Sequence, residues 1–279
     1  MAFIGTNAVA RGNETVDTKF SPIVEANLWA DSIFQADRTF TTRYQTDAMG
    51  QLFVRRLGKG TVDRSGSLTF THNQTADELI PIVIDEDFKQ SEAIYEEVEI
   101  ARTSGTGAQK FETLVRNVNE EWQGVAMSKL VDGATASANT TATSAETIKT
   151  DIINVRKELR DNKANPTALI VSPRVFAFLQ DFSGKEYQPS FNDDVLRTGQ
   201  MGMFLGVPVY ENPLMTDDGT SGAVEFVMYD HEAYSILTQL IGQRIMDAGK
   251  DWVGSVAQFH IKSGFKVTTP ERVIKKTVA

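Results

Sequence analysis

A long amphipathic stretch from Gln109 to Leu130 sets the strongest constraint on the fold. Its apolar residues recur at steps of three and four, which places them on one face of an α-helix. Gly133 stands just past this stretch as a helix stop. The apolar stripe consists of Phe111, Val115, Val118, Trp122, Val125 and Leu130. A helix this long must lay its stripe on another layer, so we predict that it supports a β-sheet.

A second constraint is the stretch GQLFVRRLGKGTVDRSGSLTFTHNQ at residues 50–74. Alternation around Leu52 and Val54, and again around Leu68 and Phe70, predicts two strands. The glycine-dotted connection between them is too long for a two-residue turn. An isolated two-stranded ribbon is marginal in water, so we expect this hairpin to lie on another surface.

Charge is unevenly distributed along the chain. The net charge of −9 disfavours general binding of nucleic acid, which needs a dense basic face. Residues 51–66 nevertheless carry a net charge of +3, and residues 85–99 a net charge of −6. Two interpretations stay open: solvated charge clusters, or a basic hairpin that docks on the acidic strip of a neighbouring copy. The candidate contact residues are Arg55, Arg56, Lys59, Arg64, Asp85, Glu86, Asp87, Glu96 and Glu97.

The middle of the chain predicts an α/β layer. The small-residue stretch 132–145 indicates a linker, and a helix is expected from Thr143, which has Glu146 at the capping-box spacing. Ser172 and Pro173 are expected to begin a further helix as its cap and first residue. The first of these helices has the apolar stripe Ile148, Ile152, Val155 and Leu159. Strands are expected at residues 168–171, 207–210, 225–229 and 235–240.

The tail of the chain predicts β structure again. Two strands, at residues 253–261 and 265–269, flank an expected turn at Lys262, Ser263 and Gly264. A short final strand begins at Val273. We expect these strands to cover the long helix, which gives two lobes of mixed helix and strand, one of them discontinuous in sequence.

No pattern in the sequence indicates catalysis, a cofactor or a metal. There is no cysteine and no phosphate-binding glycine loop, and the three histidines, His72, His231 and His260, lack metal-ligand spacing. Ser263 and Lys266 match a serine–lysine spacing of penicillin-recognising enzymes, but here they span an expected hairpin turn. No run of about 18 apolar residues indicates a membrane span. We therefore expect no enzyme, no cofactor and no membrane association.

The order of these parts resembles the major capsid protein of tailed double-stranded DNA bacteriophages. The specific segments are VSPRVFAFLQD at 171–181, GQMGMFLGVPVYENPLM at 199–215, VMYDHEAYSILTQL at 227–240 and the stretch from RIMDAGKDW to ERVIKK at 244–276. They share hydrophobic, glycine and proline positions with the family rather than catalytic signatures. The resemblance implies an α+β, HK97-like capsid fold.

The resemblance also implies a role for each part of the chain. Residues 1–45 would be an N-terminal arm that reaches adjacent copies, and residues 46–84 an extended hairpin over a neighbouring subunit. Residues 85–142 and 241–279 would form a peripheral lobe with the long helix as its spine. Residues 143–240 would form the axial α/β lobe, around which copies gather.

The function that the resemblance implies is structural. Copies would assemble into hexamers and pentamers of an icosahedral phage head that encloses double-stranded DNA, with non-specific contact to that DNA. Residues 1–36 are too short for the scaffold region that some members carry, so the resemblance implies either a separate scaffolding protein or an already trimmed chain. A portal and a decoration protein are the other expected partners. Assembly would take place in the host cytoplasm, and the product would be the capsid of the virion.

Three other functions stay open at this stage. An encapsulin-like nanocompartment shell would enclose protein rather than nucleic acid. An α/β enzyme with an unrecognised site would be a compact monomer with a self-packed hairpin. A DNA-binding module that uses Arg55, Arg56, Lys59 and Arg64 would bind with a steep dependence on salt.

Overall fold

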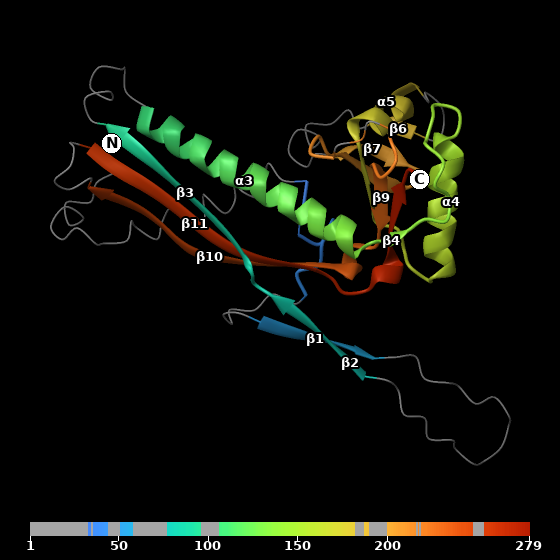
Figure 1. Ribbon diagram of the computed structural model, residues 1–279, viewed down its shortest axis with the longest axis horizontal. Helices are drawn as coiled ribbons and strands as arrows, with labels where there is room; N and C mark the ends of the chain where they lie inside the picture. The colour runs from blue at the N-terminus through green and yellow to red at the C-terminus, as the bar shows by residue number, and fades with distance from the viewer. Residues whose placement is uncertain are drawn as a thin grey trace, which may run out of the picture.

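The computed structural model of the chain describes residues 33–34, 36–43, 51–57, 77–95, 106–181, 187–189, 200–215, 217, 219–247 and 254–279. These residues form an elongated helix-on-sheet layer, a more compact lobe around a second sheet, and a two-stranded hairpin that projects from the first sheet (Figure 1). The predicted α+β class is confirmed.

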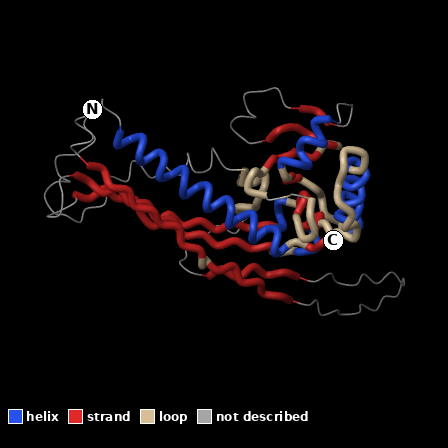
Figure 2. The backbone as a smooth tube through the Cα atoms, turned by 45° about the horizontal axis from the view of Figure 1, so that its top comes forward, coloured by secondary structure: helices blue, strands red, loops and turns tan. Residues whose placement is uncertain are grey.

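The elongated layer consists of one long helix on one antiparallel sheet. Helix α3 (Thr106–Gly133) runs along the strands β10 (Tyr234–Asp247), β11 (Gly254–Val267) and β3 (Glu86–Tyr95), in that order across the sheet (Figure 2). The predicted stripe is confirmed at four buried residues, Val115, Val118, Trp122 and Leu130. Val125 is only half-buried, because the stripe continues through Ala126 and Met127, one and two positions further along the helix.

The turn predicted at residues 262–264 is wrong, because β11 runs through it without interruption. Alternate residues from Ala257 to Val267 are buried in one series that faces α3, and Ser263 belongs to this series. The hydroxyl of Ser263 is satisfied there, since Nε1 of Trp122 donates to its Oγ at 2.8 Å. The neighbouring Gly264 is also buried, on the opposite face of the strand. Packing on both faces therefore explains two residues that look like a turn in the sequence.

The compact lobe is built on a mixed sheet of seven strands with both faces covered. Strands 168–171, 207–210 and 225–229 of the prediction are confirmed. In order across the sheet the strands are β4 (Thr135–Ala136), β12 (Val273–Thr277), β9 (Val224–Tyr229), β5 (Ala168–Val171), β8 (Val207–Glu211), β7 (Gln200–Phe204) and β6 (Tyr187–Pro189). Leu169 and Val171 point to one face, where α4 (Ile148–Asp161) and α5 (Pro173–Asp181) cover them. Ala168 and Ile170 point to the other face and join the core of α3.

The two predicted helix caps have different outcomes. Ser172 caps α5 as predicted, because its Oγ accepts the backbone N–H of Val175 at 3.3 Å. The capping box of Thr143 and Glu146 is wrong, since α4 begins at Ile148. The predicted stripe of α4, from Ile148 to Leu159, is buried as expected.

Thr143 belongs instead to a buried polar network beside the second sheet. Its backbone N–H and its hydroxyl donate to the two carboxylate oxygens of Glu225, each at 2.6 Å. Nη1 of Arg174 lies 3.6 Å from the same carboxylate and 3.0 Å from that of Asp217. A buried charge is tolerated only when it is paired and hydrogen-bonded, and this network meets that requirement for Glu225. The network therefore requires Thr143 outside the helix.

Two strands lie in a different sheet from the one to which the predicted lobe boundaries assign them. The residues predicted as a strand at 235–240 form the start of β10, in the sheet of α3 rather than in the α/β sheet. Strand β12 lies between β4 and β9 in the seven-stranded sheet, although its residues fall within 241–279. The chain thus passes between the two layers more often than the sequence indicates.

Residues 33–34 and 36–43, which the sequence assigns to an arm on adjacent copies, contribute to the core of their own chain. Phe34 and Phe40 are fully buried. The ring of Phe34 lies 6.2 Å from that of Trp122 and 5.9 Å from that of Tyr234. The backbone N–H of Thr41 donates to the carbonyl of Tyr234 at 2.9 Å. This part of the predicted arm is therefore an anchor, and residues 1–32 lie outside the described residues.

Candidate subunit interface

The hairpin pairs β1 (Gln51–Leu57) with β2 (Asp77–Val83) in antiparallel register. The predicted arm around Leu68 and Phe70 lies outside the described residues. The described partner of β1 is a segment for which the sequence analysis predicts no strand. These two strands form a sheet of their own, separate from the other two.

The inner face of the hairpin rests on its own chain. Val54 and Ile82 are buried and form a small cluster with Leu237 of β10, flanked by the half-buried Leu52 and Ile84. This cluster attaches the base of the hairpin to β10 of the three-stranded sheet (Figure 1).

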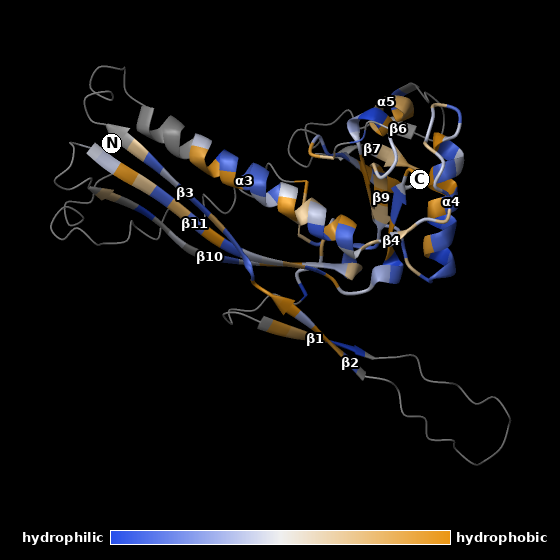
Figure 3. Cartoon of the chain, in the orientation of Figure 1, coloured by the Kyte–Doolittle hydropathy of each residue, from blue (hydrophilic) through white to orange (hydrophobic). Residues whose placement is uncertain are grey.

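The outer face of the hairpin is apolar and exposed. Phe53, Leu79 and Val83 are 56%, 60% and 45% exposed, and Pro81, opposite Phe53, is exposed as well. Figure 3 shows hydrophobic residues along both strands of the hairpin. A contiguous exposed apolar patch marks an interaction surface more often than isolated apolar residues do. Full burial of one such side chain contributes about 1.5–3 kcal/mol. This face is therefore the strongest candidate for a contact with another molecule.

The described basic candidates lie on opposite faces of β1. Arg56 belongs to the inner side, where its Nη2 lies 2.6 Å from Oε2 of Glu271 and its Nη1 4.0 Å from Oε2 of Glu78. Arg55 is exposed and pairs across the ribbon with Leu79. Arg56 thus contributes to attachment of the hairpin within the chain, whereas Arg55 lies on the outer face.

Two acidic candidates also have partners within their own chain. Oε1 of Glu86 lies 2.8 Å from Nζ of Lys129 on α3, and this hydrogen bond raises the pKa of the lysine. Asp87 accepts from Lys89 at 2.6 Å and contacts His260 on β11. The bond from Lys89, assisted by His260, lowers the pKa of the Asp87 carboxyl. These two carboxylates therefore help to hold β3 against α3 and β11.

The remaining acidic candidate of the described part, Asp85, is exposed at the junction between β2 and β3. Arg56, Glu86 and Asp87 thus pair with Glu271, Lys129 and Lys89 rather than with one another. The other four candidates lie outside the described residues: Lys59, Arg64, Glu96 and Glu97.

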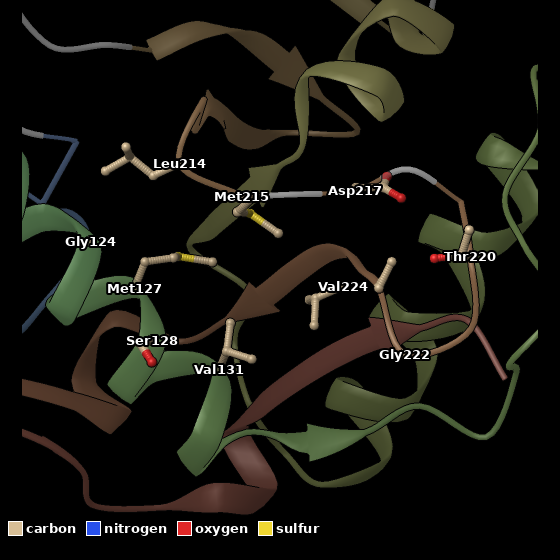
Figure 4. A pocket seen from close by; sticks show the side chains of 11 residues that line it. Gly124, Met127, Ser128, Val131, Leu214, Met215, Asp217, Thr220, Gly222 and Val224 are labelled. Atoms are coloured by element: carbon tan, nitrogen blue, oxygen red, sulfur yellow. The ribbon is translucent and has the colours of Figure 1, made fainter.

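A cleft of about 760 Å³ opens between α3 and the segment that joins β8 to β9 (Figure 4). Met127, Val131 and Met215 line it, so its walls are mainly aliphatic. Its carboxylate, Asp217, accepts hydrogen bonds from Ser172 at 2.7 Å and Arg174 at 3.0 Å. These two bonds tie the carboxylate to the first turn of α5 and to Ser172, the residue that caps it.

The described residues also include no group of His, Asp and Glu side chains able to hold a metal ion. Among the described helices, none combines the length and the apolar content that crossing a membrane requires.

The sequence analysis missed the outer face of the hairpin, although a signal for it is present. The stretch DELIPIV of β2 carries apolar residues on both faces of the strand, with Leu79, Pro81 and Val83 alternating with Ile80 and Ile82. Such a strand is typical of burial on two sides. In the described chain only one of these sides is covered, which indicates a partner for the other.

The family comparison matches the central part of the chain. The profile of the family described as phage capsid protein matches residues 107–258, which is more than half of the sequence. This segment contains nearly all of α3, every strand of the seven-stranded sheet except β12, the whole of β10 and only the first residues of β11. No curated protein sequence matches the chain.

Solved structures match over most of the chain. A structure from Mycobacterium phage Che8 has a TM-score of 0.69 and 16% identity, and the match covers 89% of this chain and 95% of that one. The mature capsid of bacteriophage PhiM1 has a TM-score of 0.57 and 13% identity, over 100% and 95% of the two chains. A virus-like particle from Pyrococcus furiosus has a TM-score of 0.58 and 13% identity, over 93% and 100%. At these identities the likeness shows a shared fold.

Proposed function

The chain belongs to the phage capsid protein family and has the HK97-like fold of a structural major capsid protein, and from this premise we propose that each copy completes its surface with the hairpin of a neighbour. The observation that carries this proposal is the exposed outer face of the hairpin, with Phe53, Leu79 and Val83. A two-stranded ribbon with one bare apolar face gains stability only when that face is covered.

The shell that we propose is an icosahedral phage head built from hexamers and pentamers and filled with double-stranded DNA. The contact is heterologous, because the hairpin and the surface that receives it are different parts of the chain. Heterologous contacts close into rings when the rotation between neighbours allows it, and otherwise they propagate. Rings of five and six copies are the closed solutions that an icosahedral shell uses.

The parts of the chain take the following proposed roles. The layer of α3 forms the peripheral lobe, and the seven-stranded sheet forms the axial lobe, around which the copies of a ring meet. The N-terminal residues before the Phe34 anchor reach adjacent copies. A separate scaffolding protein, a portal and a decoration protein complete the head, contact with the packaged DNA is non-specific, and assembly takes place in the host cytoplasm.

Charge contributes to the proposed contact through a reduced set of candidates. Arg55, Lys59 and Arg64 of one copy face Asp85, Glu96 and Glu97 of the next. Arg55 and Asp85 belong to this set because both are exposed, Arg55 on the outer face of the hairpin and Asp85 at the junction between β2 and β3. Arg56, Glu86 and Asp87 instead bind Glu271, Lys129 and Lys89 of their own chain. Exposed pairs contribute little energy individually but fix the orientation of two surfaces.

Charge reversal tests this part of the proposal. We expect the variant Arg55→Glu with Arg64→Glu to fold normally and to assemble poorly at low salt. Normal particle yield and normal salt tolerance in this variant would remove charge from the proposed contact and leave its apolar part.

Electron microscopy of the purified protein, combined with the absorbance of the particles at 260 and 280 nm, tests the function as a whole. We expect closed shells, filled with DNA when they are isolated from infected cells. Shells that contain protein cargo and no nucleic acid would instead support the nanocompartment function. A monomer at all concentrations would contradict assembly.

A further inference from the structure

The chain passes from the hairpin to the three-stranded sheet beside one glycine, Gly264 of β11. Strand β3 pairs with β11 as far as Glu86, which lies opposite Ser263. At the next residue of β11, Gly264, the backbone of Val83 and Ile84 at the end of β2 lies against the strand. A Cβ atom at Gly264 would lie 2.3 Å from the carbonyl oxygen of Val83 and 3.0 Å from Cα of Ile84. Both neighbours are backbone atoms, so they have no side-chain rotation with which to move aside.

The residue beside this glycine carries a large side chain. Leu237 of β10 is the cross-strand partner of Gly264, so both face the hairpin from the same side of the sheet. The side chain of Leu237 is buried against Val54 and Ile82 of the hairpin. A projecting leucine and a bare glycine thus stand side by side under the two strands of the ribbon. We call this pair the hairpin seat.

Other attachments of the hairpin base are weaker determinants of its angle. No ladder of backbone hydrogen bonds joins β1 or β2 to the three-stranded sheet among the described residues. The ion pair of Arg56 and Glu271 is partly exposed, and exposed pairs contribute about 0–1 kcal/mol. Steric contact at the seat is therefore the strongest constraint on how the hairpin projects.

We propose that the hairpin seat, Leu237 and Gly264, sets the angle between the hairpin and the three-stranded sheet, and that this angle determines the size of the shell. The inference rests on the proposed function, because the angle has consequences only if the outer face meets another copy. In a heterologous contact a change of angle changes the rotation between neighbours, and with it the closure of the assembly.

The variant Gly264→Ala tests the seat. To restore ordinary contact, the Val83 carbonyl must retreat by about 1 Å, and the hairpin turns with it. The matched control is Gly242→Ala, a glycine of the adjacent strand whose added Cβ would meet nothing within 4 Å. We expect the yield of parent-sized particles to fall at least about tenfold for Gly264→Ala and to stay unchanged for the control.

A distance measurement reports the angle directly. Since the chain has no cysteine, spin labels can be attached uniquely through Glu78→Cys on the hairpin and Glu120→Cys on α3. Both positions are exposed. In dissociated subunits we expect one label-to-label distance for the parent and for Gly242→Ala, and a shifted distance for Gly264→Ala. If Gly264→Ala does not fold, Leu237→Ala is measured instead, with a broadened distance distribution and mixed particle sizes expected.

The outcomes separate this inference from the proposed function. If the parent protein builds no shells, the proposed function fails. If the parent builds shells, and the seat variant changes both the distance and the particle size, the inference is supported. A seat variant that changes only one of the two, or neither, overturns the inference and leaves the proposed function intact.

Discussion

The hairpin and the seven-stranded sheet both contain strands with apolar side chains on two faces, but the two faces are covered differently. In β5 all four residues are buried, because α4 and α5 cover one face of the sheet and the core of α3 covers the other. In the hairpin the inner face is buried against Leu237, whereas Phe53 and Leu79 on the outer face are more than half exposed.

The difference shows which apolar faces are covered within one subunit and which face is left for a neighbouring copy to cover. The sheet finds both of its partners within one subunit, so substitutions there act on folding. The hairpin finds only one, so substitutions on its outer face act on assembly. The predictions below test this division, from the largest expected change in the stability of the dissociated subunit to the smallest.

The largest change is expected for Phe226→Ala in β9. This ring is fully buried in the cluster under α4 and α5. Truncating a buried phenylalanine costs about 3–5 kcal/mol. Urea unfolding of the dissociated subunit measures the change, and a loss below about 1 kcal/mol would contradict the tight packing of this face.

A smaller loss is expected for Thr143→Val, which keeps the shape of the side chain and removes its hydroxyl. The buried carboxylate of Glu225 would lose a hydrogen bond of 2.6 Å. Leaving a buried acceptor without its partner costs about 1–3 kcal/mol. The control Thr150→Val, at an exposed position of α4, should stay within about 0.5 kcal/mol of the parent. Equal stabilities for the two variants would show that the hydroxyl of Thr143 has no role in folding.

The attachment of the hairpin base is expected to contribute about 0–1 kcal/mol through Arg56 and Glu271. A double-mutant cycle with Arg56→Gln and Glu271→Gln measures the interaction energy of this pair. A coupling above about 2 kcal/mol would mean that the ion pair, rather than the seat, holds the hairpin.

The smallest change in stability is expected for the double variant Phe53→Ser with Leu79→Ser on the outer face. Both side chains are exposed, so the unfolding free energy should move by no more than about 0.5 kcal/mol. Assembly should nevertheless be lost, as measured by sedimentation of the particles. Ile153→Ser, at a 40% exposed position of α4, is the matched control and should assemble normally. Loss of assembly in the control alone would place the contact on α4.

Periodicity predicted the elements whose partners lie within the chain. The stripe of α4 and the strand at 168–171 pack as their spacing indicates, and so do Val115, Val118, Trp122 and Leu130 of the α3 stripe. Prediction from periodicity and turn residues failed where small or polar residues are buried and packed. Ser263 accepts from Trp122, and Gly264 makes room for the Val83 backbone, so a continuous strand resembles a turn. Thr143 bonds Glu225, a residue far away in sequence, rather than capping a helix.

The candidate interface was only partly predictable for a related reason. A sequence shows how many charged residues a segment has, but it does not show which residues they pair with. Glu86 and Arg56 look available for a neighbouring copy and prove to be bonded to Lys129 and Glu271 of their own chain. Exposure of Phe53 and Leu79 is a property of the folded chain, because it depends on which face of the ribbon meets Leu237.

The most direct test of the account is hydroxyl-radical footprinting of the same protein as dissociated subunits and as assembled particles. The account predicts that Phe53 and Leu79 react readily in subunits and become protected in particles, while buried Phe226 stays protected in both. Equal reactivity of Phe53 and Leu79 in the two states would contradict the claim that identical neighbours cover the hairpin.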